Sequence, residues 1–255
     1  MTDPGFDLTG RRAVVTGASA GIGGAIAHRL ANAGATVVAV SRSGGIPDHD
    51  GVGRILGLTA DLSQRDDLDR VVPRVVEMLG GLDILVNNAG RGDWLALAEI
   101  DRTYFDDLIG LNLWAPLRLC QMAHPHLAAA VDPAVVMIGS IDAVRPSAGG
   151  VVYGASKAGL AAATVALSKE WGADGIRVTQ IDPGLVDTPM ATHIVRELNE
   201  SGERINIVGR AGTGDEIAGL VHYLVAPVGR FATGVSFRLD GGAAAMGPFD
   251  VRRQD

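Results

Sequence analysis

The sequence predicts an α/β fold, a single doubly wound domain with a seven-stranded parallel sheet flanked by helices. Short apolar runs alternate with longer stretches of helical periodicity, which is typical of βα units around a parallel sheet buried on both faces. The 255 residues, 47% apolar and 20% charged, are enough for one substantial core. Because no internal repeat or long linker divides the chain, we expect residues 1–255 to form one domain.

Seven short apolar runs are the expected strands, and Pro and Gly cluster in the joints that follow them. In chain order the strands are 13–16, 36–40, 54–58, 84–87, 134–138, 177–181 and 236–239. Five stretches with helical spacing of apolar residues lie between or after these runs. The expected helices are 23–33, 65–79, 103–130, 151–171 and 215–225.

Two segments do not fit this alternation. Residues 187–212 follow a Pro-Gly pair, have weak periodicity and carry mixed charge, so we interpret them as a flap. Residues 243–255 show little patterning, and we expect this tail to be disordered or to lie in a subunit contact.

Charge and cysteine content exclude several classes of site. The formal net charge is −7 and no basic run is present, which argues against nucleic acid as a partner. The single cysteine, Cys120, excludes an intramolecular disulfide, and we interpret it as a packed thiol. His124 and His126 are two residues apart, which puts them on different faces of a helix, so we expect no metal site.

The chain carries no segment that we interpret as a membrane anchor or a leader. Its longest apolar stretch, residues 158–167, is far shorter than the roughly 20 residues that cross a bilayer. The first twelve residues lack the apolar region of a signal peptide. We therefore expect a cytoplasmic protein without a membrane partner.

A glycine-rich turn follows the first predicted strand. Gly17, Gly21 and Gly23 lie between this strand and the first helix. Glycine at such positions permits backbone angles that a Cβ forbids and lets the backbone approach a pyrophosphate, at which the first helical amides then point. The spacing differs from G-x-G-x-x-G, and a turn without a ligand remains an alternative.

The residues after the second strand bear on the choice of dinucleotide. A carboxylate there would hold the ribose 2′-hydroxyl of NAD, whereas this chain has Ser41 and Arg42. A guanidinium suits a 2′-phosphate because it offers a planar fork of donors. The pattern favours NADP(H) over NAD(H), with a solvated loop arginine as the alternative.

Tyr153 and Lys157 are four residues apart at the start of a predicted helix, so their side chains share a face. A phenol has an ordinary pKa near 10, and a nearby ammonium favours the phenolate. We expect Lys157 to bring Tyr153 into the range where it donates a proton to a carbonyl oxygen or takes one from an alcohol. The pair alone is weak evidence, since it also occurs on solvated helix faces.

Ser140 ends the apolar strand at 134–138 and is expected at the carboxyl edge of the sheet, where ligands bind in open α/β folds. Its hydroxyl is positioned there to stabilise developing alkoxide charge. A capping serine is the alternative. Asn112 is a polar residue among apolar helical neighbours, for which an amide satisfied within the core is the alternative.

These motifs together resemble the short-chain dehydrogenase/reductase family, in particular its 3-oxoacyl-carrier-protein reductase-like branch. The resemblance rests on TGASAGIG, NNAG at 87–90, Asn112, Ser140, the Tyr153/Lys157 pair, DPG at 182–184 with Thr188, and LDGG near the end. It runs from about Gly10 to Gly242. Each motif is modest, but their joint order and spacing are specific.

The resemblance implies a Rossmann-type domain with the catalytic tetrad Asn112, Ser140, Tyr153 and Lys157. It further implies that Lys157 binds the nicotinamide ribose, that Asn112 holds a water in a proton relay and that Asp61 accepts from the adenine amino group. The expected cofactor residues, from the residues and the resemblance together, are Gly17, Ser19, Gly21, Ile22, Gly23, Ser41, Arg42, Asp61, Leu62, Asn88, Ala89, Gly90, Tyr153, Lys157, Pro183, Gly184, Val186 and Thr188.

One departure bears on the cofactor. Relatives that prefer NADP often have a basic residue where this chain has Ala20, so recognition of the 2′-phosphate would depend largely on Arg42.

The substrate pocket is expected to be mostly apolar, which favours a ketone or alcohol with hydrocarbon bulk. The residues expected to line it are Trp94, Ile141, Asp142, Val144, Val151 and Met190. Trp94 packing on the surface is an equal alternative. His193, within the flap, is expected at the surface.

We interpret the chain as an NADP(H)-dependent oxidoreductase, a carbonyl reductase or alcohol dehydrogenase for a small secondary alcohol or ketone. One alternative is an NAD-dependent sugar or polyol dehydrogenase, and another is a non-catalytic member that only binds cofactor. The resemblance also implies a homotetramer, and the small-residue stretch 158–167 suits close helix packing across such a contact.

Overall fold

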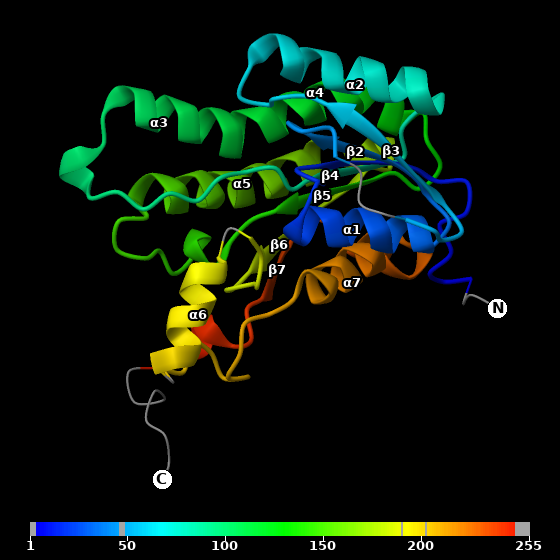
Figure 1. Cartoon of the computed structure of the whole chain (residues 1–255). Helices are drawn as coiled ribbons and strands as arrows, with labels where there is room; N and C mark the ends of the chain where they lie inside the picture. The colour runs from blue at the N-terminus through cyan, green and yellow to red at the C-terminus, as the bar shows by residue number, and fades with distance from the viewer. Residues whose placement is uncertain (1–3, 46–48, 190, 202, 248–255) are drawn as a thin grey trace.

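A fully parallel seven-stranded sheet forms the centre of the computed structural model, which describes residues 4–45, 49–189, 191–201 and 203–247 (Figure 1). Its strand order is β3-β2-β1-β4-β5-β6-β7. The strands are β1 (Arg12–Thr16), β2 (Thr36–Ser41), β3 (Arg54–Thr59), β4 (Ile84–Asn87), β5 (Ala134–Ile138), β6 (Arg177–Pro183) and β7 (Ser236–Leu239). All seven predicted strands are confirmed, with bounds that differ by at most two residues.

The strand order reverses between β1 and β4. From β1 the chain moves outward to β2 and β3, then returns to place β4 on the other side of β1. The loops after these two strands therefore leave in opposite directions and open a crevice at their carboxyl ends, which is where open α/β sheets bind ligands.

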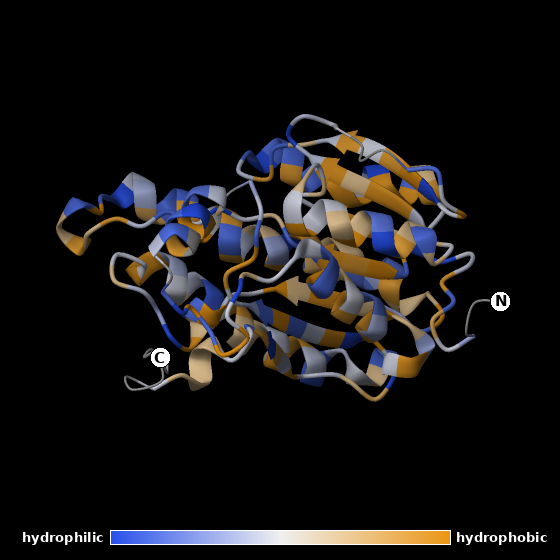
Figure 2. Ribbon diagram, turned by 60° about the horizontal axis from the view of Figure 1, so that its bottom comes forward, coloured by the Kyte–Doolittle hydropathy of each residue, from blue (hydrophilic) through white to orange (hydrophobic). Residues whose placement is uncertain are grey.

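Helices cover both faces of the sheet (Figure 1). The helices α1 (Gly21–Asn32) and α7 (Gly214–Val225) pack together on one face. The other face is covered by α2 (Arg65–Leu79), α4 (Ala115–Ala128) and α5 (Val151–Glu170). Burial on both faces explains why β1, β2, β4 and β5 are mostly apolar, and much of the sheet is orange in the hydropathy colouring (Figure 2).

The helix predicted over 103–130 is interrupted. It consists of α3 (Arg102–Ile109), a π-helical segment (Gly110–Trp114) and α4. Spacing of apolar residues does not reveal such an interruption, because the chain stays helical on both sides. A π segment widens one turn, and this one carries Asn112, whose side chain is fully buried.

The flap predicted at 187–212 contains a helix that was not predicted, α6 (Thr192–Ser201). Ile194, Val195 and Leu198 form its partly buried face, a pattern too short to stand out in the sequence. The segments beside α6 are anchored by a bridge between Val186 and Gly212. His193 is exposed, as expected.

The tail, predicted to be disordered or to lie in a subunit contact, packs against the rest of the chain as far as residue 247. The amide of Val208 donates to the carbonyl of Gly241 over 3.1 Å, and Ala243–Ala245 form a turn of 3-10 helix. The Arg145 guanidinium donates to the carbonyl of Ala243. Residues 248–255 of the predicted tail lie outside the described part.

The single cysteine lies in the core, as predicted. The Cys120 thiol is buried, which confirms that it packs, and burial raises its pKa to about 12. A raised thiol pKa disfavours the reactive thiolate.

Among the described helices, α5 alone is long and apolar enough to be a candidate membrane span. It packs against the sheet with Ser156, Lys157 and Thr164 buried, as a core helix does.

A buried ion pair ties the amino ends of β1 and β4. Arg12 donates from Nε and Nη2 to the two oxygens of Asp83, over 2.9 and 2.7 Å, and its backbone amide donates over 2.7 Å. Burial alone would raise the pKa of Asp83, but the bonds and charge of Arg12 lower it overall. Asp83 is thus held as an anion at the edge of the sheet away from the crevice.

Replacement of this anion should cost stability. We expect Asp83→Asn to lower the free energy of unfolding by roughly 2 kcal/mol, because the partly buried Arg12 loses its charged acceptor. Urea denaturation measures the change. A loss that stays constant between pH 7 and pH 3 would contradict an ionised Asp83, since a depressed pKa gives stability that disappears as the pH falls through it.

Candidate active site

The glycine-rich turn closes tightly around the end of β1. Gly17 and Gly21 have φ angles of +66° and +58°, in the left-handed region that favours glycine. A Cβ on Gly17 would lie 2.9 Å from the Asn88 amide nitrogen, and one on Gly23 would collide with the carbonyl of Gly17. The turn therefore needs glycine for its own geometry, and it leaves bare backbone at the start of α1.

Hydrogen bonds join this turn to the loop after β4. The Thr16 hydroxyl accepts from the amides of Asn88 and Ala89, each over 2.9 Å. The Asn88 side chain donates to the Thr16 carbonyl over 2.8 Å. Residues 17–23 and 88–90 thus share one side of the crevice. Sequence reasoning missed Thr16, although a hydroxyl between an apolar strand and a glycine is a recognisable signal.

The predicted dinucleotide-selecting residues lie beside the turn. Ser41 is buried at the end of β2 and Arg42 is exposed after it. The pKa of Asp61 is lowered by hydrogen bonds from the Ser63 hydroxyl and amide, and by the charge of Arg42. Arg42 and Asp61 are therefore neighbours, as binding of one adenosine moiety requires.

The segment after β6 returns to the same crevice. A Cβ on Gly21 would lie 3.4 Å from Cβ of Thr188, so Thr188 stands directly over the glycine turn. Gly184 fits closely against Asp240, and Val186 pairs with Gly212. The predicted residues Pro183, Gly184, Val186 and Thr188 thus run from the sheet edge toward the start of α1.

Ser140, Tyr153 and Lys157 meet at the carboxyl end of β5. Lys157 Nζ donates to the carbonyl of Ile138 over 3.0 Å and lies 5.8 Å from the centre of the Tyr153 ring. The Ser140 hydroxyl is close enough to the Tyr153 phenol to lower its pKa. It also accepts from the amide of Asp142 over 3.1 Å, so Ser140 caps the next turn as well as facing the tyrosine.

The electrostatics of this cluster differ from the expectation. Burial raises the pKa of Tyr153, the Ser140 hydroxyl lowers it, and the charges of Asp142 and Asp182 raise it, for a net increase. The prediction that Lys157 draws the phenol toward neutral values is therefore wrong for the protein alone, because burial and two carboxylates outweigh the ammonium. The phenol is held in its protonated form.

Burial acts on Lys157 as well. It lowers the pKa of the ammonium to about 8, and the charge of Asp182 opposes the decrease. Lys157 is thus mostly charged at neutral pH yet close to its titration range.

Asn112 joins this cluster to the β4 loop. Its side chain accepts from the Arg91 amide over 3.0 Å and donates to the Arg91 carbonyl over 2.8 Å. A Cβ on Gly90 would lie 3.0 Å from Asn112 Oδ1 and 3.6 Å from Lys157 Nζ. The four predicted catalytic residues and the predicted cofactor loop therefore converge on one place.

The predicted substrate residues differ in burial and in their contacts with the catalytic side chains. The Trp94 ring is partly exposed and lies 5.6 Å from the Tyr153 ring, centre to centre. Asp142 is buried, and its carboxylate accepts from Ser140 over 3.2 Å. Val144 and Val151 are exposed and Ile141 is partly buried. Met190 lies outside the described residues.

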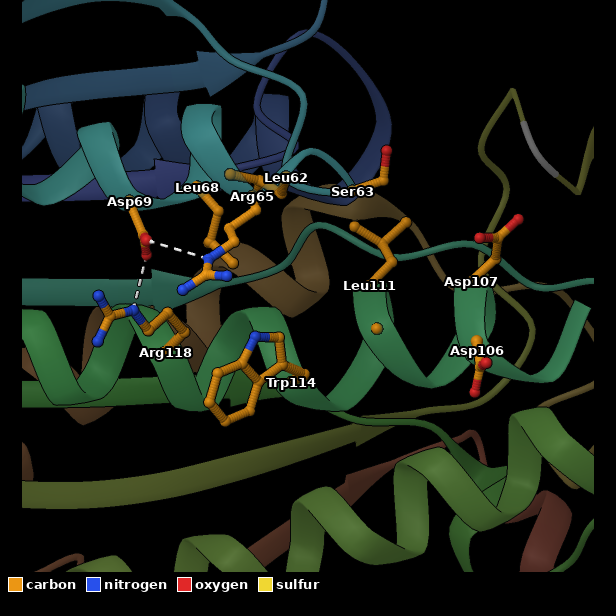
Figure 3. Close-up of a pocket in the computed structure, with 11 residues that line it drawn as sticks. Leu62, Ser63, Arg65, Leu68, Asp69, Asp106, Asp107, Leu111, Trp114 and Arg118 are labelled. Atoms are coloured by element: carbon orange, nitrogen blue, oxygen red, sulfur yellow. Dashed lines mark hydrogen bonds and ion pairs between the residues drawn. The ribbon is translucent and has the colours of Figure 1, made fainter. Parts of the chain in front are cut away.

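A cavity of about 540 Å³ lies elsewhere, between α2 and the α3–α4 helix (Figure 3). Asp69 and Arg118 form an ion pair across it, and Trp114 lies along its wall. Of the predicted cofactor residues, Leu62 lines it. The converging catalytic side chains, and not this cavity, mark the candidate site. Within the described residues, no group of three or more His, Cys, Asp or Glu is positioned to hold a metal ion.

Comparison with known proteins agrees with this arrangement. Residues 11–199 match the model of the family described as short chain dehydrogenase. The chain belongs to this family. The prediction from the motifs is confirmed, as are the fold class and the assignment to enzymes acting on CH–OH or carbonyl groups.

Relatives of this short-chain dehydrogenase span nearly its whole length. A 3-oxoacyl-acyl-carrier-protein reductase of Thermotoga maritima is 30% identical over 92% of this chain and 98% of its own. The 4-formylbenzenesulfonate dehydrogenase of Comamonas testosteroni is 32% identical over 93% of this chain and 99% of its own.

Solved structures are equally similar. A short chain dehydrogenase of Burkholderia cenocepacia in complex with NADP has a TM-score of 0.83 and 35% identity, over 93% of this chain and 99% of its own. L-sorbose reductase of Gluconobacter frateurii, complexed with NADPH and L-sorbose, has a TM-score of 0.87 and 28% identity, over 95% and 99%. Family and neighbours support oxidoreduction that depends on a nicotinamide dinucleotide.

Proposed function

We propose that the protein is an NADP(H)-dependent carbonyl reductase or alcohol dehydrogenase that interconverts a small secondary alcohol and a ketone. The observation that carries the proposal is the convergence of Ser140, Tyr153, Lys157 and Asn112 beside the glycine-rich turn. A module that only binds cofactor has no need of these four groups in one place.

The crevice suits a dinucleotide. Gly17 and Gly23 let the turn close tightly against Asn88. The first amides of α1 would then bind a pyrophosphate, as helix N-termini do. Thr16 fixes the neighbouring loop, and Lys157 beside Gly90 would hold the nicotinamide ribose. When bound, the cofactor supplies or accepts the hydride at the carbon of the substrate.

The proton is handled by side chains of the chain. In reduction the protonated phenol of Tyr153 donates its proton to the carbonyl oxygen as the carbon receives hydride. Ser140 hydrogen-bonds the same oxygen and stabilises the developing negative charge. The Lys157 ammonium stabilises the tyrosinate that remains until solvent reprotonates it. In oxidation the same steps run in reverse.

Removal of the phenol hydroxyl tests this function. We expect Tyr153→Phe to lower kcat/KM by roughly 10²- to 10⁴-fold, because the proton donor is lost while the ring stays. Absorbance of the reduced nicotinamide measures turnover on ketones, β-keto thioesters, keto sugars and polyols, and cofactor binding should persist. Tyr223→Phe, on the surface of α7, is the control and should retain full rate.

Three outcomes of this assay matter. Undiminished turnover in Tyr153→Phe would remove Tyr153 as the proton donor. Turnover confined to sugars or polyols with NAD would favour the alternative dehydrogenase. If the wild-type protein binds NADP but turns over no substrate of the panel, the non-catalytic alternative is favoured.

The preference for NADP(H) depends on Arg42, which is exposed at the end of β2 next to Asp61. We expect Arg42→Ala to raise the KM for NADP roughly ten- to a hundredfold, because a charge-assisted bond to the 2′-phosphate is lost, and to leave the KM for NAD unchanged. Arg54→Ala, at the amino end of β3, is the control. Equal effects on both cofactors would refute the assignment.

We further propose a homotetramer as the working form and, as from the sequence, a cytoplasmic location. Large apolar side chains that are exposed in the single chain support subunit contacts. They include Trp114 in the segment before α4, Val165 on α5, and Phe231 and Val235 before β7.

The tetramer is tested by sedimentation. We expect a species of four chains of 26.3 kDa, and Phe231→Asp should reduce it to a dimer because the charge would be buried in one contact. A monomer at micromolar concentration would contradict this assembly.

A further inference from the structure

A buried carboxylate lies behind the catalytic cluster, and the mechanism above does not use it. Asp182 is 2% exposed near the end of β6. Its Oδ1 accepts from the Gln180 side chain over 2.6 Å, and a Cβ on Gly139 would collide with the same oxygen. The carboxylate therefore lies against the backbone of the residue directly before Ser140.

The surrounding chain is shaped to accommodate this group. Gly139, on the neighbouring strand end, has no Cβ where the Asp182 carboxylate lies, and a Cβ there would collide with Oδ1. Gln180 is fully buried, and its oxygen is 3.4 Å from the hydroxyl of Thr164 on α5. A series of polar side chains thus runs from α5 through β6 to the backbone at Gly139, next to Ser140.

Lys157 needs a counter-charge. Its ammonium is buried, and it donates a hydrogen bond to the neutral carbonyl of Ile138. An unpaired buried ammonium is costly and tends to lose its proton. Asp182 lies against Gly139, the residue that follows the carbonyl bound by Lys157, and its charge favours the ammonium. Burial raises the pKa of Asp182, and the bond from Gln180 and the charges of Lys157 and Arg238 oppose this increase.

We propose that Asp182 is a positioning residue of the active site, whose buried carboxylate fixes the backbone at Gly139, next to Ser140, and balances the charge of the Lys157 ammonium. Its meaning for catalysis rests on the proposed function, whereas its effect on Lys157 does not. The charged or titratable groups around the pair are Tyr153 on α5, Asp142 in the loop after β5, and Arg238 on β7.

The chain offers a direct test because it contains two lysines, Lys157 and Lys169. Lysine labelled with ¹³C at Cε gives two NMR signals, of which exposed Lys169 serves as an internal reference. Burial places the pKa of Lys157 at about 8. In Asp182→Asn, which keeps the shape and loses the charge, we expect the titration of Lys157 to move down by at least about one pH unit.

Asp83→Asn is the matched control. It also neutralises a buried carboxylate, but at the amino end of β4, far along the strand direction from Lys157. Asp83→Asn should lower the free energy of unfolding and leave the pKa of Lys157 unchanged. A Lys157 pKa that stays unchanged in folded Asp182→Asn, or that moves equally in Asp83→Asn, would overturn the proposal.

Two more measurements test the proposal independently of whether Asp182→Asn folds. If Asp182→Asn does not fold, the Lys157 signal of the wild-type protein is followed at acidic pH, where the lysine itself stays charged. Burial raises the pKa of Asp182 above its ordinary value, so an inflection from its ionisation is expected in the acidic range where the protein stays folded. A flat signal there would overturn the proposal. If the wild-type protein turns over a substrate, the alkaline limb of the pH profile of kcat/KM should shift to lower pH in Asp182→Asn. A lack of turnover would count against the proposed function, but it would not affect the titration result.

Discussion

The structure of the site depends on the hydrogen bonds of the Thr16 hydroxyl. One oxygen at the end of β1 accepts two successive amides of the loop after β4. Because these adjacent strands send their chains to opposite faces, the loops would otherwise diverge. The bonds hold the glycine turn and residues 88–90 on one wall, and Asn112 extends the connection to Arg91 and α5. Positions distant in sequence thus become parts of a single crevice.

Much of the fold was predictable because a parallel sheet buried on both faces needs continuous apolar strands, which the sequence shows. The glycine turn, Ser140 and the Tyr153/Lys157 pair were proposed from their residue types and spacing, which have a chemical purpose, whereas the role of Asn112 followed from the family resemblance. The π segment at Asn112 and helix α6 were not predictable, since one adds a residue within a helix and the other has a short apolar face.

Electrostatics were the least predictable part. The raised pKa of Tyr153 results from burial and from Asp142 and Asp182, which lie 11 and 29 positions away in the sequence and are brought together by the sheet edge. Spacing along one helix identifies Lys157 as a neighbour but not these carboxylates. The protein alone is therefore poised with a protonated phenol and a marginally charged lysine, and the two groups are best regarded as one coupled system.

The close fit of Gly139 against Asp182 has a consequence for how this sheet edge can change over generations. A side chain at 139 is accommodated only after both the carboxylate at 182 and the amide at 180 have been lost or displaced, whereas the loss of either group needs no prior change at 139. The substitution at 139 therefore has to come last. A lineage that had acquired a methyl group at 139 would be barred from regaining the acid by a single step.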